Sequence, residues 1–510
     1  MKYILYILIV MLSTTSFAQL LNPQSKKITE KFFPDSEAIL DVTPALQKKK
    51  GFTSYKELIN FIEKLVDDHT DIISFSYIGK SQKGKDIPMV KMTIPNDKEK
   101  IKVFMQGGLH GNEPASTESM LYLMNRLLNN DKYKPLLEHI DLAIIPMANI
   151  DGYLKNNRYA ANGLDLNRDQ TKLMAKESVI LKQAFTDFDP HVAVDFHEYR
   201  PYRRDYARMG DFGVTNMYDA MFLYSGNLNI PENLRQLTND LFVDNAREIL
   251  NQNNYKHHPY ISSTKVEGDI HINQGSISAR SSASNFALTN TISSLIEIRG
   301  VALGRTSFKR RIHSSFLIAI SYLQTAAENM QLVKDEIDKA ISQKNPQVVE
   351  FKRGIYKDDI QFIDVNTAEY TTIEMTVRDA WKAEAALTRE RPKAYLVDSS
   401  ASHIIEKLNV LGIAVETLEE PKTFSIQSYK VTGYFRKPIR YEKMKLQSVE
   451  VEIVEEEKTF KAGTYYIPMD QKRANLLAEV LEPEAPNSFV SFGIIKTQKE
   501  DILPIYRILN

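Results

Sequence analysis

His110, Glu113 and His197 are the residues whose types and spacing indicate chemistry most clearly. His110 and Glu113 are three residues apart in the segment GGLHGNE (residues 107–113), and His197 ends the much later segment DFH (residues 195–197). Two imidazoles and one carboxylate form a typical donor set of catalytic zinc sites, which keep a fourth position for water. The metal lowers the pKa of that water to roughly 7. The set therefore predicts a hydrolase that binds one zinc ion.

We expect the first two of these residues on a turn between a strand and a helix. The mostly apolar run over residues 101–106 predicts a buried strand, and Pro114 stands where a first helical residue belongs. Free amide groups at the start of a helix favour an anionic carboxylate such as that of Glu113. Residues 192–196 predict a second strand, which ends at His197. Ligands at strand ends are typical of open α/β sheets.

A His-x-x-Glu pair alone is a weak indication, because such pairs often occur without binding metal. Further motifs stand in order along the chain: NIDGY (149–153), Arg158, GLDLNRD (163–169) and LIEIRG (295–300). Together with the histidine motifs, this ordered set resembles the zinc carboxypeptidase family typified by carboxypeptidases A and B. The resemblance covers roughly residues 52–307, about half of the chain.

Glu297 is the candidate general base. It lies in an apolar strand pattern over residues 294–298, where burial disfavours the charged form of an unpaired carboxylate. The resemblance implies that Glu297 takes a proton from the attacking water and passes it to the leaving amine. The alternative is a structural ion pair with Arg299, which would share a strand face with Glu297.

The resemblance implies that three further residues contact the substrate. Arg158 would stabilise the negative charge that develops on the scissile carbonyl oxygen, and an exposed turn arginine is the alternative. Asn167 and Arg168 match the pair that holds the terminal carboxylate of a peptide, for which a guanidinium is a two-point clamp. Such a clamp implies an exopeptidase. Asp195 is expected either to orient a zinc-binding histidine or to cap a strand end.

The chain departs from the family at the residue that closes over the substrate. In well-known members a tyrosine stands at a set distance before the catalytic glutamate. At that distance before Glu297, this chain has Gly275. Arg280 is a candidate substrate contact, with a surface arginine as the alternative. Residues 281–284, where the pocket floor is expected, are small and mostly hydroxylated, so the preferred end residue stays open. Four arginines lie within residues 200–208. They either belong to a solvated loop or give the site a preference for acidic substrates.

The N-terminus has the pattern of a cleavable export signal. Lys2 supplies a positive start, residues 3–12 an apolar core, and residues 16–18 a small-residue cleavage site that ends at Ala18. We therefore expect an exported protein, periplasmic or secreted. The apolar core is too short to span a bilayer, and no later run approaches the roughly 20 apolar residues that a membrane helix needs.

The composition excludes several classes of protein. The chain has no cysteine, which excludes disulfides, thiolate metal ligands and lipid attachment to a cysteine. Its 65 basic and 65 acidic residues balance, so nothing indicates a nucleic-acid partner.

At 510 residues the chain is long enough for two or more domains. Alternating strands and helices over residues 19–342 predict an α/β domain, a mixed and mostly parallel sheet flanked by helices, closed by one long helix over residues 310–342. After a linker at residues 343–346, residues 348–510 predict a smaller β-rich accessory domain, which resembles the C-terminal extension of some exported bacterial relatives. We expect it to shape access to the zinc site or to stabilise the enzyme.

The sequence thus predicts an exported zinc metallocarboxypeptidase that hydrolyses the last amide bond of peptides with a free C-terminus. A related alternative is a hydrolase of peptidoglycan stem peptides with the same fold. A further alternative is a non-catalytic protein that binds peptide termini. The presence of Glu297 beside three metal ligands disfavours this last alternative, because a binding protein needs no base.

Overall fold

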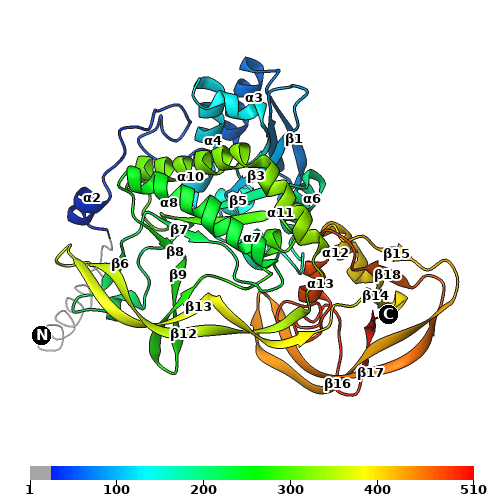
Figure 1. Cartoon of the computed structure of the whole chain (residues 1–510). Helices are drawn as coiled ribbons and strands as arrows, with labels where there is room; N and C mark the ends of the chain where they lie inside the picture. The colour runs from blue at the N-terminus through cyan, green and yellow to red at the C-terminus, as the bar shows by residue number, and fades with distance from the viewer. Residues whose placement is uncertain (1–23, 510) are drawn as a thin grey trace, which may run out of the picture.

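A sheet of eight strands forms the centre of the molecule (Figure 1). The computed structural model describes residues 24–509, and the predicted export signal at residues 1–18 lies outside them. In order across the sheet, the strands are β1 (Ile73–Lys80), β2 (Asp86–Met92), β4 (Ile140–Ile145), β3 (Ile101–Gly107), β5 (Val192–Tyr199), β11 (Ile292–Arg299), β7 (Ala220–Leu223) and β8 (His257–Pro259). The strands β4, β3, β5 and β11 are parallel, as are β7 and β8, whereas the other three neighbouring pairs are antiparallel. The predicted mixed, mostly parallel sheet is confirmed.

Helices cover both faces of this sheet, as predicted. On one face, Ser282 at the start of α9 donates a hydrogen bond to Asp195 of β5 at 2.5 Å. On the other face, Arg311 of α10 forms an ion pair with Glu198 of the same strand. Asp195 and Glu198 are three residues apart, so their side chains leave opposite faces of the strand. The α-helices of the described chain are α2 (Lys26–Phe32), α3 (Tyr55–Asp68), α4 (Pro114–Asn129), α5 (Ile150–Tyr153), α6 (Lys176–Phe188), α7 (Glu232–Leu237), α8 (Asp244–Gln252), α9 (Ser282–Ala287), α10 (Phe308–Glu328), α11 (Met330–Ser342), α12 (Ile405–Val410) and α13 (Asn475–Val480).

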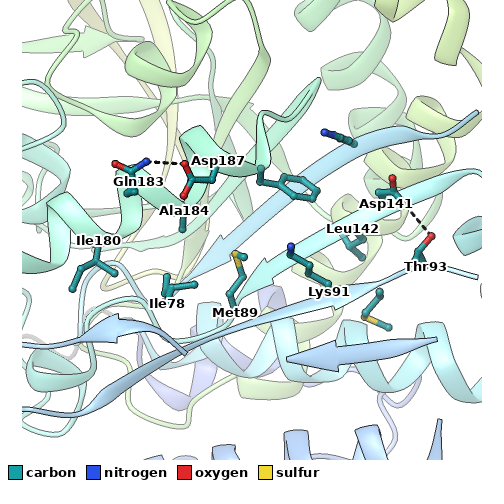
Figure 2. Close-up of a pocket in the computed structure, with 13 residues that line it drawn as sticks. Ile78, Met89, Lys91, Thr93, Asp141, Leu142, Ile180, Gln183, Ala184 and Asp187 are labelled. Carbon is teal, nitrogen blue, oxygen red and sulfur yellow. Dashed lines mark hydrogen bonds between the residues drawn. The ribbon is translucent and has the colours of Figure 1, made fainter. Parts of the chain in front are cut away.

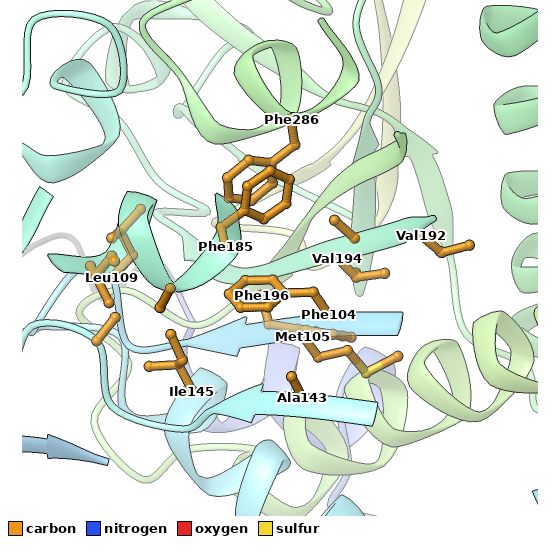
Figure 3. Close-up of a cluster of buried hydrophobic side chains, with 14 of the residues drawn as sticks. Phe104, Met105, Leu109, Ala143, Ile145, Phe185, Val192, Val194, Phe196 and Phe286 are labelled. Carbon is orange, nitrogen blue, oxygen red and sulfur yellow. The ribbon is translucent and has the colours of Figure 1, made fainter. Parts of the chain in front are cut away.

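An aromatic cluster fixes α6 and α9 over the sheet (Figure 3). Phe185 of α6 and Phe286 of α9 stack with their ring centroids 4.1 Å apart. Phe104 of β3 packs edge-on against both rings, at 5.5 Å and 6.1 Å. Aromatic pairs of this kind contribute about 0.5–1.5 kcal/mol beyond their buried area. The aromatic cluster therefore helps to hold α9 and α6 against β3 of the sheet.

The long helix predicted over residues 310–342 is two helices, which is a correction. The first, α10, ends at Glu328, and α11 begins at Met330. Asn329 separates them with a non-helical backbone (φ −117°, ψ 24°). Its side-chain Nδ2 donates to the carbonyl oxygen of Thr325 at 2.9 Å. Asparagine side chains compete in this way with the bonds of a continuing helix.

A second sheet joins the two halves of the chain. Its order is β6 (Val214–Asn216), β12 (Gln347–Asp364), β13 (Tyr370–Arg389), β10 (Asp269–Gln274) and β9 (Ile261–Val266). The hairpin of β12 and β13 thus pairs with β6 on one side and with β10 on the other. The strands that follow the predicted linker therefore complete a sheet that begins earlier in the chain.

The third sheet contains the C-terminal strands, and the predicted β-rich region is confirmed. Its order is β15 (Glu416–Thr417), β18 (Tyr465–Pro468), β14 (Ala394–Val397), β19 (Ile502–Ile508), β16 (Lys422–Tyr441) and β17 (Met444–Phe460). Figure 1 shows β16 and β17, in orange, as a long curved hairpin. Across residues 24–509, no helix has both the length and the apolar character that crossing a membrane requires.

Candidate active site

The turn between β3 and α4 has the predicted form. β3 ends at Gly107, and α4 begins at Pro114 with Glu113 as its N-cap residue. Gly108 adopts φ +69°, and a Cβ atom at this position would lie 2.6 Å from Oγ1 of Thr117. Only glycine fits such a backbone without strain. The turn therefore brings the next residues back over the end of the sheet.

His110, Glu113 and His197 lie together and are buried. Nδ1 of His110 is 2.7 Å from Oε1 of Glu113, and Nδ1 of His197 is 3.0 Å from Oε2 of Glu113 and 3.0 Å from Nδ1 of His110. Donors held about 2.0–2.1 Å from a tetrahedral zinc ion are roughly 3.3 Å apart. The separations approach this value, so the three residues fit a zinc ion.

Two carboxylates orient the histidine rings of this cluster. Nε2 of His197 lies 2.9 Å from Oδ2 of Asp195, and Nε2 of His110 lies 3.0 Å from Oδ1 of Asp165. An ionised carboxylate only accepts hydrogen bonds, so each ring carries its proton on Nε2 and directs the Nδ1 lone pair toward the common centre. Burial opposes the charge of Asp165, but His110 and Arg158 hold its pKa well below the usual range. Asp195 was expected either to orient a zinc-binding histidine or to cap a strand end. In the structure it contacts His197.

Glu297 lies directly beside the cluster. In the register of β11 and β5, Glu297 is the partner of His197. Its Oε2 is buried and, within residues 24–509, has no hydrogen-bond partner. Burial raises the pKa of Glu297 to about 7, and the charge of Glu113 acts in the same direction. Arg299 instead donates to Asn216, Thr215 and Gln24, so the alternative of an ion pair between Glu297 and Arg299 is wrong.

The two predicted arginines and Asn167 line the same cavity as Glu297. Nε of Arg158 donates to Oδ2 of Asp165 at 2.9 Å, and its Nη1 is 3.5 Å from Oε1 of Glu113. The Asn167 side chain is fixed by a hydrogen bond of 2.8 Å from the Ser282 backbone N–H to its Oδ1. Arg168 is in contact with the backbone of Asn167, since its Nη1 donates to the carbonyl oxygen at 2.7 Å.

Gly275, the departure from the family pattern, also lines this cavity, together with Arg280 and Tyr260. The Gly275 backbone N–H donates to the carbonyl oxygen of Tyr260 at 2.9 Å. A Cβ atom at Gly275 would lie only 3.2 Å from the Trp381 ring. Tyr260 therefore lies beside the position at which the family pattern has its tyrosine, although it comes from an earlier strand connection.

The cavity beside the cluster has a volume of about 510 Å³ and two walls. The loops after β3 and β5, the segment between α5 and α6 that carries Asn167 and Arg168, and the segment before α9 that carries Arg280 form one wall. The second sheet forms the other wall, with Asn273 of β10 and Arg353 of β12. The β12 strand, which follows the predicted linker, therefore contributes directly to the cavity.

Another cavity, of about 520 Å³, lies between α6 and the strands β2 and β4 (Figure 2). It is lined by apolar side chains such as Met89 and Ile180, and four of its polar side chains pair with one another. Thr93 donates to Asp141 at 2.9 Å, and Gln183 donates to Asp187 at 2.7 Å. These polar groups do not converge on one point, and the cavity does not include the metal-binding cluster.

The fold and the buried cluster define a zinc hydrolase. A zinc carboxypeptidase family model matches residues 58–208. Carboxypeptidase 2 of Trichophyton rubrum is 31% identical over 441 residues, which cover 84% of this chain and 81% of the relative. Carboxypeptidase 2 of Trichophyton tonsurans is 30% identical over 470 residues, which cover 90% of this chain and 87% of the relative. Carboxypeptidase A from Helicoverpa armigera, a solved structure, is 18% identical, with a TM-score of 0.43 over 56% of this chain and 78% of that chain.

The chain belongs to the zinc carboxypeptidase family. It is therefore a zinc metallocarboxypeptidase, and the family acts on peptides. The two relatives are fungal, so a bacterial origin stays a prediction. The alignment with 90% of the chain includes most of the region after residue 348, so most of that region has counterpart sequence in this relative.

Sequence reasoning missed two contacts of the site. Asp165 stands in the motif with Asn167 and Arg168, but no spacing rule indicates that its carboxylate reaches His110. Glu198, next to a predicted ligand, is buried in an ion pair with Arg311 and accepts a hydrogen bond from the N–H of Ala115 at 3.0 Å. A charged residue in a run of buried strand residues is the one signal that could have drawn attention to Glu198.

Proposed function

We propose that this protein is an exported exopeptidase that removes the last residue of peptides with a free C-terminal carboxylate. The observation that carries the proposal is the position of Asn167 and Arg168 in the same cavity as Glu297 and His110. A carboxylate bound by the guanidinium and the amide would place the last amide bond near the proposed base. Peptide hydrolysis itself follows from the family.

His110, Glu113 and His197 are the residues that would hold the zinc ion, with Asp165 and Asp195 orienting the two rings. When bound, zinc supplies a Lewis acid that activates water and polarises the scissile carbonyl. The carboxylate partners of the histidines raise the basicity of the ligand atoms and fix their direction.

Glu297 would act as the general base. Its buried Oε2 accepts a proton from the attacking water, and the same atom then donates that proton to the leaving amine. Burial raises the pKa of Glu297 to about 7 in the absence of metal, and a bound dication favours the carboxylate, so the group is ionised and able to accept a proton near neutral pH. Arg158 would donate to the carbonyl oxygen of the scissile bond as negative charge develops there.

Arginines on both walls of the cavity favour peptides with carboxylates beyond the terminal one. The cavity is lined by Arg158, Arg168, Arg200, Arg203, Arg280 and Arg353. Among the described residues, the acidic side chains in the lining are those of Glu297 and Glu198, and Glu198 is already paired with Arg311. We expect kcat/KM to be higher for peptides with glutamate as the last or penultimate residue than for the same peptides with lysine. Equal values, or a preference for lysine, would contradict this substrate preference.

Export rests on the sequence pattern that ends at Ala18. Expression of the full chain with its natural N-terminus, followed by N-terminal sequencing of the extracytoplasmic protein, tests the expected cleavage before Gln19. An intact Met1 on a protein that stays inside the cell would contradict export.

Peptidoglycan stem peptides are the second candidate substrate, since an exported enzyme would meet them and Gly275 alters the usual substrate-closing position. Incubation of the zinc-loaded protein with defined muropeptides and with protein-derived peptides, side by side, separates the two. Activity confined to the protein-derived set would exclude the cell-wall substrate. A binding protein without turnover, the third alternative, would retain peptides with a free C-terminus while hydrolysing none.

A further inference from the structure

The tip of the β16–β17 hairpin reaches the active site from the C-terminal region. The two strands pair from Lys422 opposite Phe460 to Tyr441 opposite Met444. Near the tip, Gln447 anchors the hairpin to the C-terminal region, with its N–H donating to Ser491 at 3.0 Å. Beyond this anchor the hairpin ends in Tyr441, Glu442 and Lys443, which are here called the hairpin tip.

Three contacts join the hairpin tip to Arg280 in the cavity wall and to the segment just before Asn167. Oε2 of Glu442 accepts a hydrogen bond of 2.8 Å from the backbone N–H of Asp165. Nζ of Lys443 donates to the carbonyl oxygen of Asn162. The Arg280 guanidinium lies over the Tyr441 ring, with its Cζ atom 4.7 Å from the ring centroid.

Asp165 connects the hairpin tip to the metal-binding cluster. Its N–H is held by Glu442, while its carboxylate contacts His110 through Oδ1 and Arg158 through Oδ2. A shift of this residue would therefore move both a zinc ligand and the proposed oxyanion donor. Outer partners of a ligating histidine commonly affect metal affinity or activity about 10- to 100-fold.

The backbone of the turn is strained at both of its central residues. Glu442 and Lys443 both have positive φ, +46° and +63°. A two-residue hairpin turn of this kind favours Asn-Gly or Asp-Gly, because other residues adopt positive φ at a cost. Strained residues of this type are concentrated at functional sites.

We propose that the hairpin tip contributes to the active site by positioning residues of the metal-binding cluster and of the substrate pocket. Glu442 is a positioning residue, which holds Asp165 and through it His110 and Arg158. Tyr441 sets the shape of the substrate pocket by holding Arg280 against its ring. The role of Tyr441 rests on the proposed exopeptidase function, whereas the role of Glu442 extends to zinc binding and does not depend on the substrate.

The test of Glu442 uses zinc affinity of the full mature protein, measured by competition with a chelator. Glu442→Ala removes the acceptor for the Asp165 N–H, and we expect the zinc Kd to rise about 3- to 10-fold, less than for a direct histidine partner. Glu442→Gln keeps an acceptor oxygen and should restore the wild-type Kd. Glu455→Ala is the matched control, because Glu455 lies exposed on the same hairpin and accepts a hydrogen bond of 2.9 Å from half-buried Gln427, away from Asp165. A Kd of Glu442→Ala equal to that of the control would overturn the proposal.

Hydrogen exchange gives a second measurement that does not need the alanine variant to bind metal. The Asp165 amide should be protected in the wild type and in Glu442→Gln, and should exchange faster in Glu442→Ala. An unprotected Asp165 amide in the wild type would overturn the contact itself. Neither measurement involves turnover, so an inactive wild-type enzyme would count against the proposed function and not against this inference.

The test of Tyr441 uses the steady-state kinetics of peptide hydrolysis. Tyr441→Phe keeps the ring under Arg280 and should leave KM close to the wild-type value. Tyr441→Ala removes the ring, and we expect KM to rise about 3- to 10-fold while the zinc Kd stays unchanged. An unchanged KM in Tyr441→Ala, or equal effects of the two substitutions, would overturn this role of Tyr441.

Discussion

Replacement of Glu297 by glutamine is the substitution that separates zinc binding from proton transfer. Glutamine has the same shape but accepts no proton at neutral pH. Because Oε2 of Glu297 has no hydrogen-bond partner in the described part of the chain, the substitution breaks no hydrogen bond at that atom. It also leaves the three residues of the metal-binding cluster in place. The variant should therefore fold and bind one zinc ion.

The loss in rate follows from the role of Glu297. General acid–base catalysis contributes about 10²- to 10⁴-fold, which corresponds to roughly 3–5 kcal/mol of activation free energy. We expect kcat of Glu297→Gln to fall by this factor. The measurement is kcat and KM on one peptide, with zinc content determined on the same preparation. Turnover comparable to the wild type, or loss of the zinc ion, would refute the assigned role.

The pH dependence of the wild type follows from the same group. Burial raises the pKa of Glu297 to about 7 in the absence of metal. A base must be ionised to accept a proton, so kcat/KM should rise with pH through the pKa of Glu297. A bound dication favours the carboxylate, so in the zinc enzyme this rise should lie below pH 7. A rate that falls as pH rises from about 4 to 7 would contradict the base role.

Three further substitutions test other parts of the account. His197→Ala should lose the zinc ion, as measured by metal analysis, whereas His258→Ala, outside the cluster, should keep it. Arg168→Ala should raise KM for a free-acid peptide about 10- to 100-fold, because a charged hydrogen bond contributes roughly 1.5–3 kcal/mol; an unchanged KM would exclude it from the carboxylate clamp. Arg311→Ala leaves the buried carboxylate of Glu198 unpaired and should lower the free energy of unfolding in urea by about 3–5 kcal/mol. A loss below 1 kcal/mol would contradict the importance of that pair.

Local signals were sufficient to predict the strand, turn and helix that carry the first two ligands. Gly107, Gly108 and Pro114 act through their own backbone preferences; the observed β3 matches the predicted strand within one residue, and α4 begins at Pro114 as predicted. The break at Asn329 was missed because the apolar periodicity continues across it, and a single side-chain hydrogen bond to Thr325 ends the helix.

Contacts between distant segments were not predictable in the same way. Glu442 and Asp165 are 277 residues apart, and nothing in either segment indicates the other. The register of β12 against β6 and β13 against β10 depends on how the two halves of the chain pack, which no local pattern encodes. The sequence therefore indicated the residues of the metal-binding cluster and the candidate base, whereas the second wall of the cavity and the hairpin tip emerged only from the structure.

The most direct test of the central claim compares peptides that differ only at their C-terminus. The zinc-loaded protein, from residue 19 to residue 510, is incubated with a peptide library in matched free-acid and amidated forms, and the products are followed by mass spectrometry, with Glu297→Gln as control. We predict the loss of one end residue from the free acids alone, and no product with the variant. Equal cleavage of the amidated peptides, or cleavage at internal bonds, would contradict the exopeptidase assignment.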